Sequence, residues 1–84
     1  MKIDSTKIGI IGLGYVGLPL AIEFSYKFPV IGFDINEDRI NDLEKGIDFT
    51  NEVDLLDLDR AKNISFTSDI KPLASCNFYI ITVF

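Results

Sequence analysis

The sequence predicts an α/β fold in which helices flank a parallel four-stranded sheet. Short apolar segments rich in β-branched residues alternate along the chain with segments of helical periodicity. The apolar segments lack the polar alternation of half-exposed strands, as is typical of strands buried on both faces of a parallel sheet. The first of them runs directly into a glycine-rich turn and a helix. Together these observations indicate a partial Rossmann fold with the strand order 3-2-1-4.

The first predicted unit is a strand over residues 6–12 followed by a helix over residues 15–27. Ile8 and Ile10 favour the strand because β-branched residues suit an extended backbone. Apolar side chains recur at helical spacing in the second segment, and Pro29 prevents the helix from continuing further.

The second predicted unit is a strand over residues 30–34 and a helix over residues 37–45. Either Asn36 or Asp34 is expected to cap the start of this helix, because both side chains accept hydrogen bonds from free N–H groups. Gly46 stands where a glycine commonly ends a helix.

The remaining strands are predicted over residues 64–67 and 78–84, with a helical turn or short helix over residues 68–76 between them. A polar connector with one short helix is expected over residues 47–63. A chain of 84 residues has room for one modest domain and no second one.

The composition excludes several classes of partner. The net charge is −5 and no basic patch occurs, so neither nucleic acid nor an anionic membrane is an expected partner. No apolar run is long enough for a transmembrane helix, and the N-terminus does not have the pattern of a secretory signal. One cysteine and no disulfide framework suit a reducing compartment, so the expected location is the cytoplasm.

The glycine-rich turn reads G-x-G-x-x-G, and it lies between a predicted strand and a predicted helix. Asp34 ends the next strand, 22 residues after Gly12. This context makes the motif a dinucleotide-binding fingerprint. Gly12 is expected to turn the chain sharply, Gly14 to let a pyrophosphate approach the backbone, and Gly17 to let the helix pack closely on the sheet.

The phosphate contacts are expected to come from the backbone, because no Lys or Arg lies in this turn. The N–H groups of Tyr15 and Val16 stand at the predicted start of the helix, where the helix dipole favours an anion. The turn is not a P-loop, since the G-K-[ST] sequence is absent.

Asp34 and Arg39 are the candidates for the adenosine end of the cofactor. Asp34 is expected to accept hydrogen bonds from the ribose hydroxyls and to repel a 2′-phosphate, which favours NAD over NADP. The alternative is that Asp34 is only a helix cap. Arg39 either lies along the adenine or is simply solvated.

Other residues with chemical potential have simpler interpretations. Cys76 is expected to be a small buried apolar residue, because the chain has no histidine to serve as its base. Asp54, Asp57 and Asp59 lack the spacing of a calcium-binding loop and are interpreted as a solvated acidic face, so no metal site is expected.

The stretches KIGIIGLGYVGLPLA, VIGFDINEDRINDLEKG and ISFTSDI…CNFYIITV together resemble the N-terminal part of the UDP-glucose/GDP-mannose (nucleotide-sugar) dehydrogenase family. The resemblance covers nearly the whole chain and is strongest to the branch of UDP-N-acetylglucosamine 6-dehydrogenases of the Vi-antigen type. It implies an enzyme that oxidises the sugar C6 alcohol to a carboxylate with two NAD⁺, for surface polysaccharide synthesis.

The same resemblance implies which residues meet the cofactor. The residues placed at the pyrophosphate are Gly12, Gly14, Tyr15, Val16 and Gly17. It places Asp34 at the adenosine ribose and Arg39 at the adenosine end.

The resemblance also implies what residues 1–84 lack. The family's central and substrate domains, and the Cys, Lys and Asn/Asp that carry out its catalysis, follow the part that this chain matches. Cys76 does not match the catalytic motif, so we expect no catalytic residue here, no activity of the chain alone, and UDP-sugar binding only in the full-length parent. The alternative function is an NAD-sensing regulatory module of the potassium-transport type.

The fourth predicted strand, FYIITVF, is strongly apolar. An unpaired apolar strand edge is a template for pairing with another chain. The sequence therefore also predicts self-association through this strand.

Overall fold

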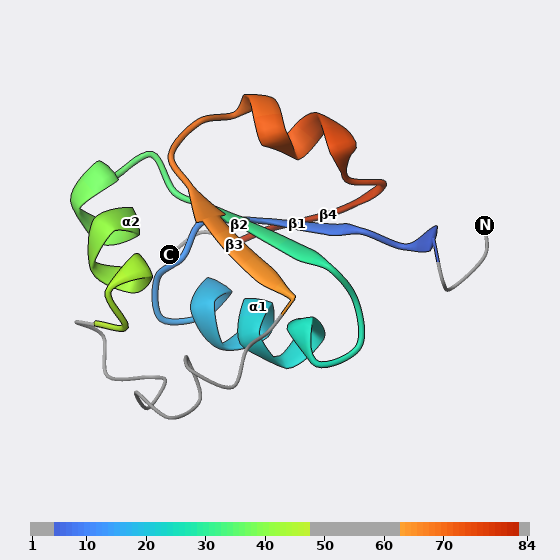
Figure 1. Ribbon diagram of the computed structural model, residues 1–84, viewed down its shortest axis with the longest axis horizontal. Helices are drawn as coiled ribbons and strands as arrows, with labels where there is room; N and C mark the ends of the chain where they lie inside the picture. Colours follow the sequence, from blue (N-terminus) through green and yellow to red (C-terminus); the bar gives the residue numbers. More distant parts are fainter. Residues whose placement is uncertain (1–4, 48–62, 83–84) are drawn as a thin grey trace.

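The computed structural model describes residues 5–47 and 63–82. Its elements follow one another in the predicted order (Figure 1). In chain order they are β1 (Ile8–Ile11), α1 (Gly17–Ser25), β2 (Val30–Phe33), α2 (Glu37–Glu44), β3 (Ile64–Thr67), the 3-10 helix η2 (Lys71–Ser75) and β4 (Phe78–Ile81).

The four strands form one parallel sheet in the order β3-β2-β1-β4, which confirms the predicted topology. Ile10 of β1 lies opposite Gly32 on one side and Ile80 on the other. The chain therefore builds outward from β1 in one direction through β2 and β3, and then crosses to the other side of β1 for β4. Ligands of open α/β sheets bind at the carboxyl ends of the strands where the order reverses in this way.

Helices cover both faces of the sheet. In Figure 1, α1 lies below the sheet and η2 above it. Alternate residues of the strands point to opposite faces, so Ile8 and Ile10 join the larger core with α1 and α2, whereas Ile31 packs with η2. The larger core consists of Ile8, Ile10, Leu13, Leu18, Ala21, Ile22, Val30, Ile40 and Leu43. The smaller core consists of Ile31, Leu73 and Cys76.

Helix α2 has a capping residue at each end, as the sequence predicts. The side chain of Asn36 accepts a hydrogen bond from the Arg39 N–H at 3.2 Å, so Asn36 is the N-cap and Asp34 is not. Gly46 has a φ of 81°, and the N–H groups of Gly46 and Ile47 donate to the carbonyls of Leu43 and Asp42. This pair of bonds is a Schellman motif.

Strand β3 has the predicted bounds, and several other elements are shorter than predicted. Helix α1 begins at Gly17 instead of residue 15, because residues 14–16 are needed for the turn out of β1. The first strand is likewise shorter than predicted, and β4 ends at Ile81. Residues 83–84 of the predicted fourth strand lie outside the described residues. The connector predicted over 47–63, apart from its two end residues, lies outside the described residues, as do Asp54, Asp57 and Asp59. Within residues 5–47 and 63–82, no helix has the length and apolar character needed to cross a membrane.

Candidate functional site

The glycine-rich loop joins the carboxyl end of β1 to the start of α1, at the point where the strand order reverses. Gly12 has a φ of +99°, a conformation that side chains other than that of glycine rarely adopt. A Cβ at Gly12 would also lie 2.6 Å from the backbone oxygen of Thr82. Gly12 therefore makes the sharp turn that the sequence predicts.

Gly17 allows α1 to start directly against the end of β1. A Cβ placed on Gly17 would lie 1.6 Å from the carbonyl oxygen of Gly12, which is far inside any permitted contact. The clash is with backbone, so no side-chain movement relieves it. This close approach confirms the packing role that the sequence predicts for Gly17.

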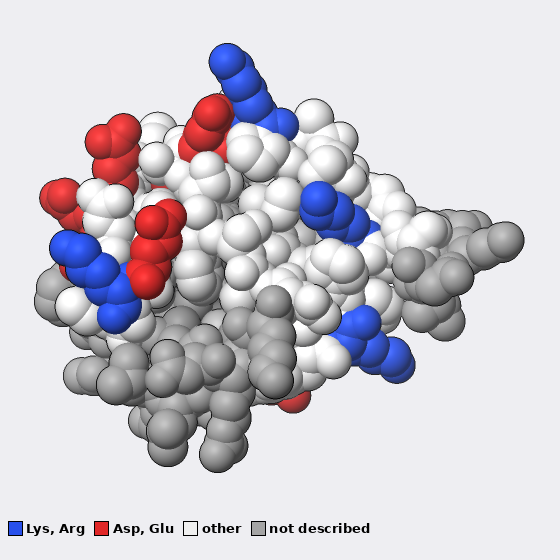
Figure 2. Space-filling view, in the orientation of Figure 1, with Lys and Arg blue, Asp and Glu red and all other residues white. Residues whose placement is uncertain are grey.

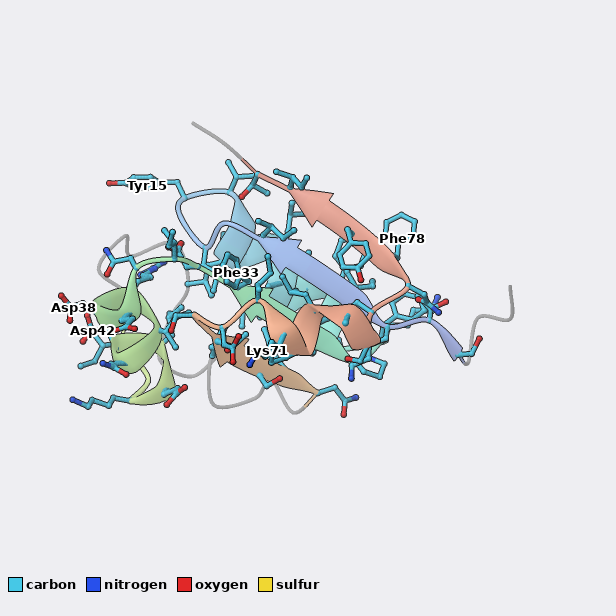
Figure 3. The ribbon with its side chains drawn as sticks, turned by 90° about the horizontal axis from the view of Figure 1, so that it is seen from above. Tyr15, Phe33, Asp38, Asp42, Lys71 and Phe78 are labelled. Carbon is cyan, nitrogen blue, oxygen red and sulfur yellow. The ribbon has the colours of Figure 1, made fainter. Side chains whose placement is uncertain are left out.

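The N-terminus of α1 has no side-chain cap from its N-cap residue. Its N-cap is Val16, which makes no side-chain cap hydrogen bond, and no acidic residue lies in the first turn. Val16 and Tyr15 are about half exposed, and Tyr15 points outward from the loop (Figure 3). A helix start with these properties suits an anion such as a pyrophosphate, because backbone N–H groups and the helix dipole both favour negative charge.

Asp34 follows β2 and contacts the glycine loop directly. Its Oδ2 accepts a hydrogen bond from the Leu13 N–H at 2.9 Å, and its Oδ1 accepts one from the Asn36 N–H at 3.0 Å. An ionised carboxylate has about four lone-pair sites, so these two bonds leave capacity for ribose hydroxyls. The alternative that Asp34 serves only as the cap of α2 is wrong, because Asn36 fills that position.

Arg39 also contacts the loop. Its Nε donates a hydrogen bond to the Leu13 carbonyl at 2.8 Å, and its side chain is partly buried. The alternative that Arg39 is simply solvated is therefore wrong. The structure brings Arg39 and Asp34 against the glycine loop, although each is more than twenty residues from Leu13 in the sequence.

Thr82 is a site residue that the sequence analysis missed. It follows β4, and its Oγ1 donates to the Gly12 carbonyl at 2.8 Å. Its backbone N–H donates to Ile11 at 2.9 Å. The only sequence signal was a single hydroxyl residue at the end of an apolar strand, and that signal does not distinguish a loop anchor from an ordinary strand residue.

Charge around the site is mostly acidic. On the face shown in Figure 2, acidic side chains gather on the side of the molecule where α2 lies. Helix α2 carries Glu37 and Asp38 in its first turn, and Figure 3 shows Asp38 and Asp42 on its outer side. Negative charge next to Asp34 disfavours a cofactor with an additional phosphate on the ribose.

Cys76 lies in the smaller core and not in the glycine loop. It is buried beside Leu73 and Ile31. Burial raises the pKa of its thiol above the ordinary value, although the positive charge of Lys7 and a hydrogen bond with Ser75 act in the opposite direction. The expected role as a small apolar residue is confirmed. In the part of the chain that the structure describes, no group of three His, Cys, Asp or Glu residues can hold a metal ion.

The fold and the loop together define the class of protein, which is a mononucleotide-binding half of a dinucleotide-binding fold. The sequence profile of the UDP-glucose/GDP-mannose dehydrogenase family, NAD binding domain, matches residues 6–84. The chain belongs to this family, and NAD is the cofactor of the domain that it matches. The match favours a dehydrogenase domain over the alternative of a potassium-transport regulatory module.

Three curated proteins are similar to this chain over nine-tenths or more of its length. The chain is 53% identical over 77 residues to a UDP-N-acetyl-D-glucosamine 6-dehydrogenase of Pseudomonas aeruginosa, covering 92% of this chain and 18% of that protein. It is 53% identical over 81 residues to a protein of the same name from Salmonella typhi, covering 96% of this chain and 19% of that one. It is 50% identical to Protein CapL of Staphylococcus aureus, and the match covers 90% of this chain and 18% of CapL.

Solved structures of nucleotide-sugar dehydrogenases share the fold. A UDP-D-ManNAc dehydrogenase from Pyrococcus horikoshii superposes with a TM-score of 0.82 at 31% identity, over 93% of this chain and 20% of that one. A UDP-glucose dehydrogenase from Pyrobaculum islandicum gives a TM-score of 0.84 at 28% identity. The match covers 93% of this chain and 19% of that one. The chain thus spans about a fifth of the length of the proteins it matches.

Proposed function

We propose that this chain supplies the NAD-binding site of a dehydrogenase that oxidises C6 of a UDP-N-acetylhexosamine, or of UDP-glucose, to the uronic acid. The observation that carries the proposal is the identity of 53% to two UDP-N-acetyl-D-glucosamine 6-dehydrogenases across nearly the whole chain. The product class suits surface polysaccharide synthesis in the cytoplasm, where UDP-sugars serve as precursors.

In this proposal the cofactor lies across the carboxyl end of β1. The pyrophosphate meets the loop and the first turn of α1, that is Gly12, Gly14, Tyr15, Val16 and Gly17. The uncapped start of α1 and the absence of basic side chains in the loop support this placement, since the backbone is then the donor that an anion meets. When bound, NAD⁺ is the hydride acceptor.

The adenosine half of the cofactor lies toward β2 and α2. Asp34 binds the ribose hydroxyls, and Arg39 lies at the adenosine end. The remaining lone pairs of the Asp34 carboxylate and the acidic first turn of α2 support NAD as the preferred form.

Isothermal titration of the chain with NAD⁺, ADP and NADP⁺ tests the cofactor site. We expect NAD⁺ and ADP to bind weakly, because the chain contacts only the adenosine diphosphate part, and NADP⁺ to bind more weakly still. No binding of NAD⁺ or ADP at millimolar concentration would contradict the proposal, and so would equal binding of NADP⁺.

The chemistry itself is assigned to residues outside residues 1–84. The only thiol in this chain is Cys76, which lies in the smaller core and whose pKa is raised by burial. We expect no NADH formation when the chain alone is mixed with NAD⁺ and UDP-N-acetylglucosamine, and UDP-sugar binding only in a full-length parent. Appearance of NADH absorbance with the chain alone would overturn this assignment.

We also propose that the chain, taken by itself, self-associates through β4. Among the described residues β4 is the outermost strand on its side of the sheet, and it exposes Phe78, Tyr79 and Ile81. Such an edge accepts a further strand readily. Light scattering at high protein concentration tests this, and a monodisperse monomer would contradict it.

A further inference from the structure

Leu13 lies in the glycine loop and is held in place through both its side chain and its backbone. Its side chain is fully buried, and it lies over β2, so that a Cβ on Gly32 would approach its methyl groups to 3.0 Å. Its backbone is held from two sides by side chains of the following unit. Asp34 accepts from the Leu13 N–H at 2.9 Å, and Arg39 donates to the Leu13 carbonyl at 2.8 Å.

These two bonds hold the two peptide groups on either side of the Leu13 Cα. One peptide group joins Leu13 to Gly12 and the other joins it to Gly14, so both neighbouring glycines of the fingerprint are affected. Glycines are the residues with the most conformational freedom, and a loop that contains several of them needs external contacts to keep one shape.

We propose that Asp34 and Arg39 are positioning residues that set the shape of the glycine loop before any nucleotide binds. The proposal rests on the proposed function only in assigning that loop to the pyrophosphate. Asp34 then has two tasks, because the carboxylate that faces the ribose is the same one that fastens the loop. Arg39 contributes to cofactor affinity through Leu13, whether or not it also touches the adenosine.

Preorganisation of this kind raises affinity because the ordering of the loop does not have to accompany binding. It also couples the two ends of the cofactor site. A change at the ribose end disturbs the pyrophosphate end through Leu13, and replacement of Asp34 alone therefore weakens NAD binding without producing a good NADP site.

Amide hydrogen exchange of the ligand-free chain, read by NMR, tests the proposal. The variants are Asp34→Asn and Arg39→Met, with Asp42→Asn and Lys45→Met as charge-matched controls from α2 and its C-cap. Hydrogen bonds to charged groups contribute enough to local stability that each variant is expected to accelerate exchange at the Leu13 and Gly14 amides by about tenfold or more. The controls are expected to leave these amides unchanged.

The effect of Arg39→Met on the Leu13 amide is the most informative, because that amide bonds to Asp34 and not to Arg39. Unchanged loop exchange together with weaker NAD⁺ binding would overturn the proposal and restrict Arg39 to a nucleotide contact. Equal acceleration at the core amides of Ile10 and Ile31 would also overturn it, since that pattern means a global loss of stability.

Arg39→Lys is a second variant that preserves charge and removes the Nε–H donor. We expect it to accelerate loop exchange as Arg39→Met does, and wild-type exchange in this variant would overturn the assignment of the Nε–H bond. The exchange measurements are made without nucleotide, so unchanged loop exchange in the variants overturns the proposal even if NAD⁺ fails to bind. Failure of NAD⁺ to bind tests the proposed function alone.

Discussion

Helices α1 and α2 begin in opposite ways. Helix α2 has its N-terminus satisfied from within, by the Asn36 side chain and by the acidic residues Glu37 and Asp38 in its first turn. Helix α1 has no side-chain cap and no acidic residue in its first turn. The loop before α1 is instead held from outside, by Asp34 and Arg39 at Leu13 and by Thr82 at Gly12.

We propose that this difference separates a helix start that only stabilises the fold from one that binds an anion. A capped N-terminus is stabilised by its own side chains, which occupy N–H groups and place negative charge where an anion would bind. An uncapped N-terminus lacks that stability, but its N–H groups stay available to an anion. It can bind the anion well when other residues fix its geometry without covering those N–H groups. The side chains that hold the α1 loop do so through Leu13 and Gly12, and not through the first turn of the helix.

The largest effect is expected from Gly17→Ala, which breaks the close start of α1. The new Cβ meets the Gly12 carbonyl oxygen, so the backbone has to shift. We expect destabilisation by about 3 kcal/mol in urea unfolding and loss of measurable NAD⁺ binding, because overpacking against backbone is poorly relieved.

Gly46→Ala is the matched control at the other helix. Its φ of 81° makes alanine unfavourable there, with an expected cost of about 1 kcal/mol. NAD⁺ affinity is expected to be retained in this variant. Equal loss of binding in Gly46→Ala and Gly17→Ala would show that both act through stability alone.

Val16→Asp gives α1 the acidic start that α2 already has. Val16 is about half exposed, so the carboxylate fits without repacking. We expect stability to remain equal or to rise by about 0.5 kcal/mol through the helix dipole, while NAD⁺ affinity falls by about tenfold or more through charge repulsion. The control is Val16→Asn, which adds no charge. Unchanged NAD⁺ affinity in Val16→Asp would exclude the start of α1 from the phosphate site.

Asn36→Ala removes the cap of α2. Loss of its bond to the Arg39 N–H is expected to cost about 1 kcal/mol in thermal or urea unfolding. NAD⁺ affinity is expected to change by less than about threefold, because a helix cap acts on stability and not on the cofactor. A loss of affinity much greater than the loss of stability would place Asn36 in the binding site.

The smallest effect concerns pH and Cys76. Burial raises the thiol pKa in the folded state, so the unfolded chain releases its proton first. The contribution of Cys76 to stability is therefore complete below the unfolded pKa, about 8.5, and is lost as the pH rises from there through the folded pKa. Urea unfolding between neutral and alkaline pH should show a decline in stability that Cys76→Ala reduces. An identical decline in Cys76→Ala would contradict this account.

The sequence was sufficient for those features that depend on local pattern. The alternation of strands and helices, the turn at Gly12, the close start at Gly17 and the C-cap at Gly46 each follow from residue type and neighbours, and the structure confirms them. The start of α1 was predicted two residues early, because periodicity alone does not show how many residues the turn needs.

The contacts that hold the loop were beyond the reach of sequence pattern. Arg39 bonds to a residue 26 positions away, and Thr82 to one 70 positions away. The sequence marked Arg39 only as a candidate for the adenosine end, because a charged residue on a helix is usually solvated. A threonine at the end of a strand gives no sign of a distant partner. The fold itself creates these partners by bringing β2, α2 and β4 to the same end of β1.

We propose that the start of α1, and not that of α2, receives the pyrophosphate of the cofactor. Titration of isotopically labelled protein with NAD⁺, followed by amide chemical shifts, tests it most directly. We predict the largest shifts at the amides of residues 13–17, a smaller response at Asp34, and little change around Gly46. Saturating NAD⁺ with no shift in residues 13–17 would contradict the account.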